Sequence, residues 1–362
     1  MIVADSQWMA LALRHAERGL FTTSPNPRVG CVLVKDGKVV GEGWHERAGE
    51  PHAEVHALRA AGKQSQGATA YVTLEPCSHH GRTPPCADAL IAAGVKRVVA
   101  AMQDPNPLVA GQGIARLRAA GIEVESGLME AAARELNIGF VARMSRGMPW
   151  VRSKIAASVD GHTALNNGTS KWITGEAARN DVQHWRARSC AVLTGVGTVL
   201  ADDPQLNVRG IATTRQPLRV ILDSHLRLPP AARILDGGVL VYTASADAAK
   251  RAALEQKGAE VVQLPGTNGQ VDLRGAMRDL AQRGCNEVLV EAGRTLNGAL
   301  LQAGLVDELV LYLAPQLLGD AARGMADLGE LTQLQQRVAL HWQDVRQVGG
   351  DLRIVARITK EK

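Results

Sequence analysis

The sequence predicts an α/β fold arranged as two domains, and three observations support this prediction. The chain has 362 residues, which is more than a single hydrophobic core usually serves. Hydrophobic residues make up 46% of the chain but aromatic residues only 3%, so Ala, Val, Leu and Gly dominate, as is typical of parallel sheets. Short apolar runs alternate with helical patterns along the whole sequence. We expect a first domain over residues 1–147 and a second over 148–362.

The elements predicted for the first domain follow one another closely. A helix from Asp5 to Gly19 begins with polar residues and ends at a glycine. Residues 29–44 form a hairpin around the turn KDGK. A second helix starts at Pro51 and closes on Gly62. The remaining elements are a strand at 68–77, a helix at 83–94, a strand at 96–104, a helix and a strand within 110–127, and a helix near 129–138.

The stretch RMSRGMPW (143–150) marks the boundary, because Gly147 and Pro149 interrupt regular structure. Beyond it, strands alternate with helices, which predicts a mainly parallel sheet. The expected strands are 150–157, 190–194, 218–223, 239–243, 259–263, 287–291, 307–314 and 352–358. The expected helices are about 176–188, 246–257, 272–283 and 295–303. Residues 339–358 read as a terminal hairpin.

Charge and cysteine content limit the class of protein. The net charge is +5 and the pI about 9.1, with charges scattered singly, which suits a phosphorylated small molecule as well as nucleic acid. Five dispersed cysteines argue against a disulfide scaffold and for a reducing compartment. The N-terminal stretch resembles a capped amphipathic helix, and no apolar run approaches the roughly 18 residues that span a membrane. We expect a cytoplasmic protein.

Two stretches, PHAEVHAL (51–58) and EPCSHHGRTPPC (75–86), concentrate residues that bind metals. Zinc binds Cys thiolate and His nitrogen, and a catalytic zinc keeps one position open for water. His52, Cys77 and Cys86 could supply three ligands. Glu54 would then lie next to the water without binding the ion, which is the arrangement found in zinc deaminases.

Other interpretations of these stretches remain open. A structural zinc would need a fourth ligand, from His56, His79 or His80. His52 and His56, four residues apart on a helix, could bind a metal as a pair. The cluster could also be a polar surface without a metal. A catalytic site is favoured because His-x-Glu before Pro-Cys…Cys puts a proton carrier beside the ion; the other three histidines are then expected to face substrate or support the ligands.

Two glycine-containing stretches in the second domain are weaker signals. GVGTVL (195–200) lacks the third glycine and the acidic partner of a dinucleotide fingerprint, which argues against a Rossmann domain. In VLVEAGRTLNGALL (288–301), a buried strand ends at Glu291, and Gly293 to Gly298 lead into a helix whose free N–H groups could hold a phosphate. An ordinary strand–loop–helix connection is the alternative.

The motifs resemble those of the bifunctional deaminase/reductases of bacterial riboflavin biosynthesis. The matching segments of the first domain are residues 24–37, 43–58, 73–86 and 104–114. Those of the second are 154–164, 170–175, 195–209 and 290–300, so the resemblance runs essentially end to end. Eight residues separate Cys77 from Cys86 where most of the wider deaminase superfamily have two, and the riboflavin branch shares this insertion. The resemblance implies an N-terminal cytidine-deaminase-like α/β/α sandwich and a C-terminal α/β domain similar to dihydrofolate reductase.

For the first domain, the resemblance implies zinc-dependent hydrolytic deamination of 2,5-diamino-6-(5-phosphoribosylamino)pyrimidin-4-one. Zinc would be held by His52, Cys77 and Cys86, with Glu54 as the catalytic proton shuttle. The expected substrate contacts are Asn26, His45, Arg82 and Asp104. The sequences around Asn26 (SPNP) and Asp104 (DPNP) are also ordinary turn signals, which is the alternative for these two residues.

For the second domain, it implies NADPH-dependent reduction of the ribosyl side chain to ribityl, and a homo-oligomer, dimer or tetramer, formed through this half. NADPH is expected at Ala156, Trp172, Thr198, Asp202, Gly293, Arg294, Thr295, Leu296, Asn297, Gly298 and Ala299. Substrate is expected at Ser170, Arg186, Leu206, Arg209 and Glu291, with Lys154 and Glu291 as catalytic groups. The arginines suit a phosphate clamp, although Arg186 on a helix could equally be a solvated surface residue.

Two rival functions belong to other classes. A tRNA or nucleoside deaminase with an unrelated second domain would need basic patches interleaved with aromatics. The chain has only three Tyr, two Phe and six Trp, no basic cluster, and a long second half that this rival leaves unexplained. A non-catalytic zinc module explains neither the carboxylate beside the ligands nor two α/β domains.

Overall fold

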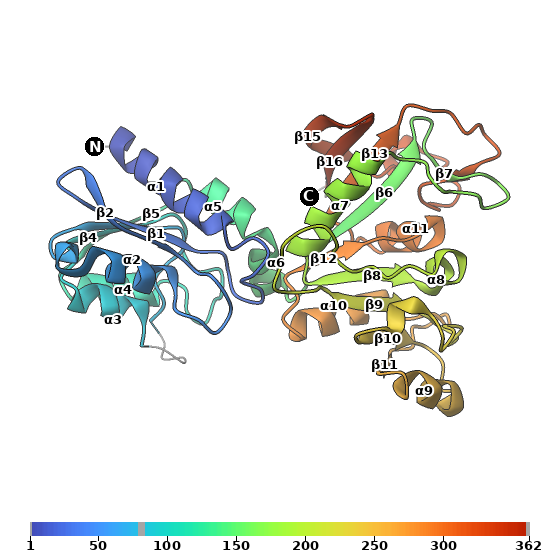
Figure 1. Cartoon of the computed structure of the whole chain (residues 1–362), viewed down its shortest axis with the longest axis horizontal. Helices are drawn as coiled ribbons and strands as arrows, with labels where there is room; N and C mark the ends of the chain where they lie inside the picture. Colours follow the sequence, from blue (N-terminus) through green and yellow to red (C-terminus); the bar gives the residue numbers. More distant parts are fainter. Residues whose placement is uncertain (1, 79–83, 360–362) are drawn as a thin grey trace. The chain divides into compact units, whose positions relative to one another are not determined.

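The computed structural model describes residues 2–78 and 84–359, and the chain divides into two compact units, Met1–Met148 and Pro149–Lys362 (Figure 1). Each unit is built on its own sheet. None of the helices in the described part of the chain combines the length and the apolar character needed to cross a bilayer.

The first unit contains a five-stranded sheet in the order β2-β1-β3-β4-β5. Its strands are β1 (Gly30–Lys35), β2 (Lys38–Trp44), β3 (Thr69–Val72), β4 (Arg97–Ala100) and β5 (Glu123–Ser126). β1 is antiparallel to β2 and β3, and the remaining pairs are parallel. The predicted hairpin turn is present: Asp36 and Gly37 both have positive φ, as a tight turn between twisted strands requires.

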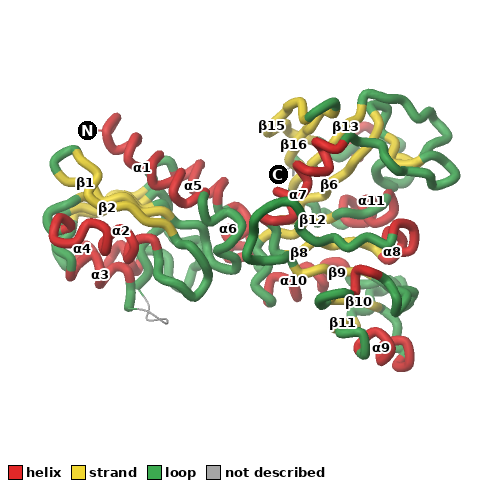
Figure 2. The backbone as a smooth tube through the Cα atoms, viewed as in Figure 1, coloured by secondary structure: helices red, strands yellow, loops and turns green. Residues whose placement is uncertain are grey.

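Helices cover both faces of this sheet because side chains alternate along each strand (Figure 2). Cys31 and Leu33 face α2 (Ala53–Ala61), α3 (Cys86–Ala92) and α4 (Gln112–Ala119). Val32 and Val34 face α1 (Ile2–Glu17), α5 (Glu130–Leu136) and α6 (Ile138–Arg146). A 3₁₀ turn, η1 (Gly62–Ser65), follows α2. The predicted three-layer α/β/α sandwich is confirmed.

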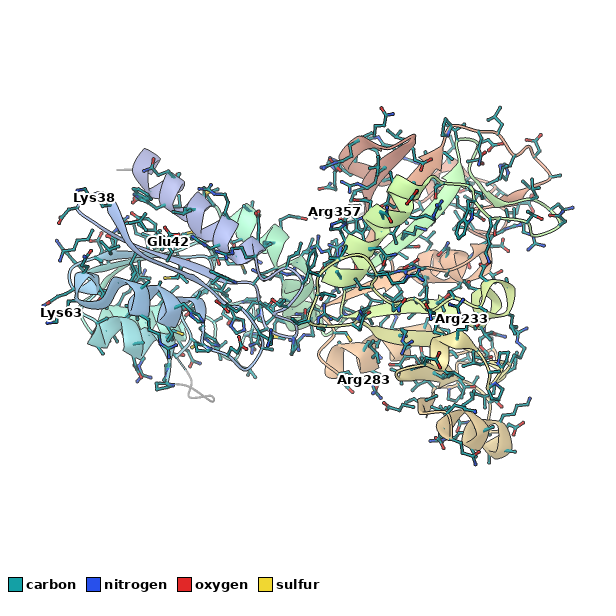
Figure 3. All side chains as sticks on the ribbon, viewed as in Figure 1. Lys38, Glu42, Lys63, Arg233, Arg283 and Arg357 are labelled. Atoms are coloured by element: carbon teal, nitrogen blue, oxygen red, sulfur yellow. The ribbon has the colours of Figure 1, made fainter. Side chains whose placement is uncertain are left out.

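Two glycines bring α2 unusually close to β2. A Cβ atom on Gly41 would lie 2.2 Å from the Ala57 carbonyl oxygen, and one on Gly43 would lie 2.5 Å from the Ala53 carbonyl oxygen. Either contact is far shorter than van der Waals distance, so only glycine fits at both positions. On the neighbouring position of β2, Glu42 turns outward to pair with His15 of α1 at 2.5 Å (Figure 3).

The second unit contains a nine-stranded sheet in the order β11-β10-β9-β8-β12-β6-β13-β16-β15. The seven strands from β11 to β13 are parallel, and β16 and β15 add an antiparallel edge. The strands are β6 (Trp150–Ser158), β8 (Ala191–Gly195), β9 (Leu218–Leu222), β10 (Val239–Thr243), β11 (Ala259–Gln263), β12 (Glu287–Val290), β13 (Glu308–Ala314), β15 (Leu340–Val348) and β16 (Asp351–Ile358). The predicted, mainly parallel α/β fold is confirmed.

Helices and short elements connect these strands. The helices are α7 (Glu176–Arg188), α8 (Val196–Asp202), α9 (Ala248–Glu255), α10 (Leu273–Gln282) and α11 (Arg294–Gln302). The 3₁₀ turns are η2 (Arg233–Leu235) and η3 (Leu334–Gln336), and β7 (His162–Ala164) pairs with β14 (Arg323–Gly324).

A buried charge cluster joins three strands of this sheet near their N-terminal ends. Arg152 of β6 is 1% exposed and its guanidinium pairs with Glu287 of β12 and Glu308 of β13, both also buried. Arg188 contacts Glu287 at 2.9 Å, and Arg357, which is labelled in Figure 3, contacts Glu308 at 3.5 Å. A buried arginine keeps its charge because both carboxylates compensate it.

The structure corrects three sequence predictions. The helix expected near 129–138 is two helices, since Asn137 separates α5 from α6 and its side chain bonds both backbone groups of Arg28. α6 then continues to Arg146, into the stretch expected to mark the domain boundary, and ends at Gly147 with φ 68°. The strand expected at 68–77 is regular only over Thr69–Val72, and helix α8 and the short strands β7 and β14 were not predicted.

Candidate metal centre and cavity of the second unit

Three side chains of the first unit converge as a metal centre would require. His52 is the residue before α2, Cys77 lies in the loop after β3, and Cys86 opens α3. Their ligand atoms all lie within 4.8 Å of one another. His52 Nδ1 is 3.3 Å from Cys86 Sγ and 3.6 Å from Cys77 Sγ, and the Cys86 backbone N–H donates to Cys77 Sγ. Two thiolates and one imidazole fit zinc and leave a fourth coordination position.

The other histidines do not join this group in the described part of the chain. His56 is not among the converging ligands, and its buried Nε2 has no hydrogen-bond partner among the described residues. His79 and His80 lie outside the described residues. The geometry therefore favours a three-ligand centre over a pair formed by His52 and His56.

Electrostatics prepare the centre for both metal binding and proton transfer. A hydrogen bond from the Cys86 thiol, followed by one with His52, lowers the pKa of Cys77, while the same bond and burial raise the pKa of Cys86, so the pair readily supplies one thiolate, the form that binds zinc. Glu54, in the first turn of α2, is only 3% exposed. Its burial raises the pKa to about 6, and Oε2 lacks a hydrogen-bond partner among the described residues. A carboxyl group with this pKa can accept and return a proton near neutral pH.

Asn26 and His45 lie beside the candidate ligands. The Asn26 side-chain amide lies 3.0 Å from His45 Nε2, and His45 Nδ1 lies 3.1 Å from the Pro51 carbonyl oxygen. Burial lowers the pKa of His45, so the ring is neutral, donates from Nδ1 and accepts at Nε2. The ring meets that of His52 edge-on, with centroids 5.3 Å apart.

Asp104 lies in the loop that follows β4. Its Oδ1 accepts a hydrogen bond from the Asn106 N–H at 2.8 Å, and its own N–H donates to Glu75 Oε2 at 3.1 Å. The turn expected from the sequence is therefore present, and it is tied to the segment that leads into Cys77. Arg82, the fourth expected contact, lies outside the described residues.

The second unit contains a cavity of about 2020 Å³. It opens where the parallel strands end, as in other α/β proteins. Most of the residues that the sequence analysis assigned to this half line it: Lys154, Ala156, Ser170, Trp172, Arg186, Thr198, Asp202, Leu206, Arg209, Glu291, Gly293, Arg294, Thr295, Leu296 and Ala299. Asn297 and Gly298 do not. Asn297 is buried and donates to the carbonyls of Ala292 and Met325 at 3.2 Å. It therefore stabilises the loop that follows β12 without facing the cavity.

Three charged side chains stand together in this cavity. Arg186 Nε and Nη2 donate to the two oxygens of Glu291 at 2.6 and 2.9 Å, and Nη1 donates to the Asn207 carbonyl at 3.0 Å. Burial would raise the pKa of Glu291, but Arg186, then Lys154, holds it below the usual value. Burial, reinforced by Arg186, lowers the pKa of Lys154. Arg186 is thus a buried partner of Glu291, not a solvated surface residue.

One side of the cavity consists of residues that no sequence motif indicates. Ser224 and His225 after β9, and the segment from Pro265 to Arg274 after β11, also line it. The predicted strand order could have indicated these residues, because loops that follow parallel strands meet at one edge of the sheet. Nothing in their residue types singled them out.

Comparison with known proteins bears on both units. A family model described as the cytidine and deoxycytidylate deaminase zinc-binding region matches residues 3–102, and one described as the RibD C-terminal domain matches residues 149–354. The riboflavin biosynthesis protein RibD of Escherichia coli (strain K12) is 52% identical over 360 residues, covering 96% of this chain and 98% of that protein. That of Haemophilus influenzae is 48% identical, covering 97% and 96%.

Solved structures agree over the full length. Acinetobacter baumannii RibD, form 1, has a TM-score of 0.94 at 50% identity, covering 99% of this chain and 100% of that one. A diaminohydroxyphosphoribosylaminopyrimidine deaminase/5-amino-6-(5-phosphoribosylamino)uracil reductase from Thermotoga maritima has a TM-score of 0.87 at 33% identity, covering 99% of both. The match over residues 149–354 accounts for the half that a nucleic-acid deaminase would leave unexplained, and that alternative is rejected.

Proposed function

Because the chain belongs to the RibD family of riboflavin-biosynthesis enzymes, which join a zinc-dependent deaminase to an NADPH-dependent reductase, we propose how its residues divide between the two reactions. Residues 1–147 deaminate 2,5-diamino-6-(5-phosphoribosylamino)pyrimidin-4-one. Residues 148–362 reduce the ribosyl side chain of the product, giving 5-amino-6-(5-phosphoribitylamino)uracil. The observation that carries the first assignment is the convergence of His52, Cys77 and Cys86 beside the buried Glu54.

In the deaminase half, His52, Cys77 and Cys86 would hold the zinc. When bound, zinc would make a water molecule a stronger nucleophile toward the ring carbon that carries the amino group. Glu54 would accept a proton from the attacking water and return it to the departing amino group, which would leave as ammonia. Its raised pKa, about 6, supports this double role because the group changes charge readily near neutral pH.

The substrate contacts of this half are Asn26, His45, Asp104 and Arg82. The bond between Asn26 and His45, and the edge-on contact of His45 with His52, support placing the pyrimidine beside the metal. Arg82 suits the phosphate because a guanidinium offers paired N–H donors to phosphate oxygens.

In the reductase half, NADPH supplies the hydride when bound. Of the expected residues that line the cavity, Ala156, Trp172, Thr198, Asp202, Gly293, Arg294, Thr295, Leu296 and Ala299 would contact NADPH, and Ser170, Arg186, Leu206, Arg209 and Glu291 would contact the substrate. Lys154 and Glu291 hold and move the proton that the sugar takes up as its ring opens. The lowered pKa of Lys154 supports this role, because a buried ammonium gives up its proton more readily.

The second half also joins copies of the chain, and the enzyme works in the cytoplasm as a dimer or tetramer. The outermost strand β15 supports self-association, since it exposes Trp342 and Val345 at 57% and 53%. Sedimentation velocity should give a mass well above the 38.5 kDa of one chain, and Trp342→Lys should lower it. Five free cysteines support a reducing compartment, and cell fractionation tests this directly.

One experiment tests the two reactions and their order. Zinc-replete protein is given the phosphoribosylated diaminopyrimidinone, and ammonia release and NADPH absorbance are followed together for wild type and Glu54→Gln. Wild type should release ammonia and then consume NADPH, whereas the variant should consume NADPH only when it is given the deaminated uracil. Absence of ammonia from a wild-type protein that contains zinc would refute the deaminase assignment.

A further inference from the structure

Glu75, two residues before Cys77, is a buried carboxylate with no part in the reactions proposed above. Its side chain is 5% exposed. Oε2 accepts hydrogen bonds from the backbone N–H groups of Asp104 and Gly111 at 3.1 and 2.9 Å, and Oε1 accepts one from Ile114 at 3.1 Å. We propose that Glu75 is a positioning residue for deamination, which fixes the 104–111 loop, and with it Asp104, relative to the loop after β3 that carries Cys77.

A carboxylate suits this place because the loop offers donors that have no other role. Gly111 precedes α4 and Ile114 lies in its first turn, where backbone N–H groups lack helical acceptors. A buried carboxylate in turn needs such donors to replace its lost hydration. The three bonds therefore give the carboxylate its donors and the backbone N–H groups an acceptor. They also join segments that are distant in the sequence.

A close packing contact holds the same segments together independently of these bonds. A Cβ atom on Gly113 would lie 1.9 Å from the Pro76 carbonyl oxygen and 3.3 Å from Glu75 Cγ. The first turn of α4 thus lies directly on the Pro76–Cys77 peptide, so the helix and the metal loop cannot slide past each other. Within the loop, Asp104 Oδ1 is braced by the Asn106 N–H at 2.8 Å.

The consequence for deamination rests on the proposed role of Asp104 as a substrate contact. Small displacements of a contact weaken the binding of a substrate without changing the reacting groups. The candidate ligands are tied together separately, since the Cys86 N–H donates to Cys77 Sγ at 3.3 Å. Loss of the Glu75 bonds should therefore raise KM, while zinc content and kcat change little.

The test is Glu75→Gln, which keeps the shape but turns an NH₂ group toward a backbone donor. We expect KM for the diaminopyrimidinone to rise about tenfold and kcat to change less than about threefold. The zinc-to-protein ratio and the reductase rate on the deaminated uracil should stay at wild-type values. Loss of zinc from the variant would overturn the proposal, because Glu75 would then serve the metal loop itself.

Asp5→Asn is the matched control. This carboxylate also accepts three hydrogen bonds, from Arg97 Nη1 and Nη2 at 3.1 and 3.0 Å and from the Tyr71 hydroxyl. It lies on α1, against the opposite face of the sheet. Asp5→Asn should lower the unfolding temperature without changing KM. An equal rise of KM in both variants would show that destabilisation alone is responsible.

A double-mutant cycle with Asp104→Ala separates this inference from the function on which it rests. If Asp104→Ala alone leaves KM unchanged, the proposed substrate contact fails and the inference fails with it. If Asp104→Ala raises KM, Glu75→Gln should raise it no further in that background. Independent effects, or no effect of Glu75→Gln, would overturn the inference alone. Should Glu75→Gln not fold, Glu75→Asp gives the same comparison, since it keeps the charge but falls short of the donors.

Discussion

In the first unit the candidate ligands and the proton carrier come from two short stretches, 51–58 and 75–86, whereas the second unit lines its cavity with residues from Lys154 to Asp327. The first centre needs only a helix start, a strand end and a second helix start to bring its groups together. The second needs the register of a nine-stranded sheet. Substitutions within the two stretches of the first unit should therefore abolish deamination and leave reduction unaffected. Reduction should also respond to substitutions far from the cavity of the second unit.

The largest effect is expected from Glu54→Gln, which tests how local the first site is. Removing the proton carrier should slow deamination about 10²- to 10⁴-fold. Zinc should remain bound, since Glu54 is not among the converging ligands, and reduction of the deaminated uracil should be unchanged. Ammonia release, zinc content and NADPH oxidation measure these outcomes. Glu50→Gln, which removes an exposed ion pair with Arg47, is the control and should change none of these three quantities.

The next effect concerns the sheet on which the second site depends. Arg152→Met would leave Glu287 and Glu308 buried without their central cation, which should destabilise the second unit by about 3–5 kcal/mol. Urea unfolding followed by reductase activity measures it. Arg283→Met removes a more exposed pair with Glu260 and should cost about 1 kcal/mol or less (Figure 3). Equal losses would mean that the buried cluster has no special role.

A smaller effect is expected from Arg186→Lys. Lysine keeps the positive charge but cannot make the paired bonds that Arg186 makes with Glu291. Reductase kcat/KM should fall about 10- to 100-fold, because Glu291 loses its fixed orientation. Ammonia release in the same protein should be unaffected. An unchanged reductase rate would show that charge alone matters at this position.

The smallest effect is a contrast in pH dependence. In the proposed mechanism Glu54 acts first as a base, so deamination should slow about tenfold for each pH unit below its pKa of about 6. Lys154 is proposed to act as an acid, so reduction should slow as the pH rises through its pKa, which burial places below the usual 10.5. The two rates, measured separately on each substrate, should have opposite slopes. Parallel profiles would contradict the assigned roles.

The sequence predicts features formed by residues that are close together in the chain better than features formed by distant residues. Spacing predicts His52, Cys77 and Cys86 as candidate ligands and Glu54 as the candidate proton carrier, and alternating apolar runs predict the strands of the second unit. Hydrogen bonds between residues far apart in the sequence cannot be predicted from spacing or from apolar runs. Asn137 ends α5 by bonding the backbone of Arg28, and Glu75 holds the amide of Gly111. Each depends on contacts that exist only after the sheet has formed.

The reductase residues show the same limit more sharply. Arg186 could be a phosphate clamp or a surface residue by sequence pattern alone. Only the fold brings it to Glu291, which is 105 residues away in the chain. Likewise, the loops after β9 and β11 line the cavity through their place at the sheet edge, and not through distinctive residues.

Gly41 and Gly43 carry a consequence for protein engineering. Their missing side chains let α2 rest against β2, and α2 carries Glu54 and follows His52. A library that varies only the residues nearest the metal would overlook both positions. A transfer of this centre to another scaffold would have to include these two glycines, although neither is a candidate ligand.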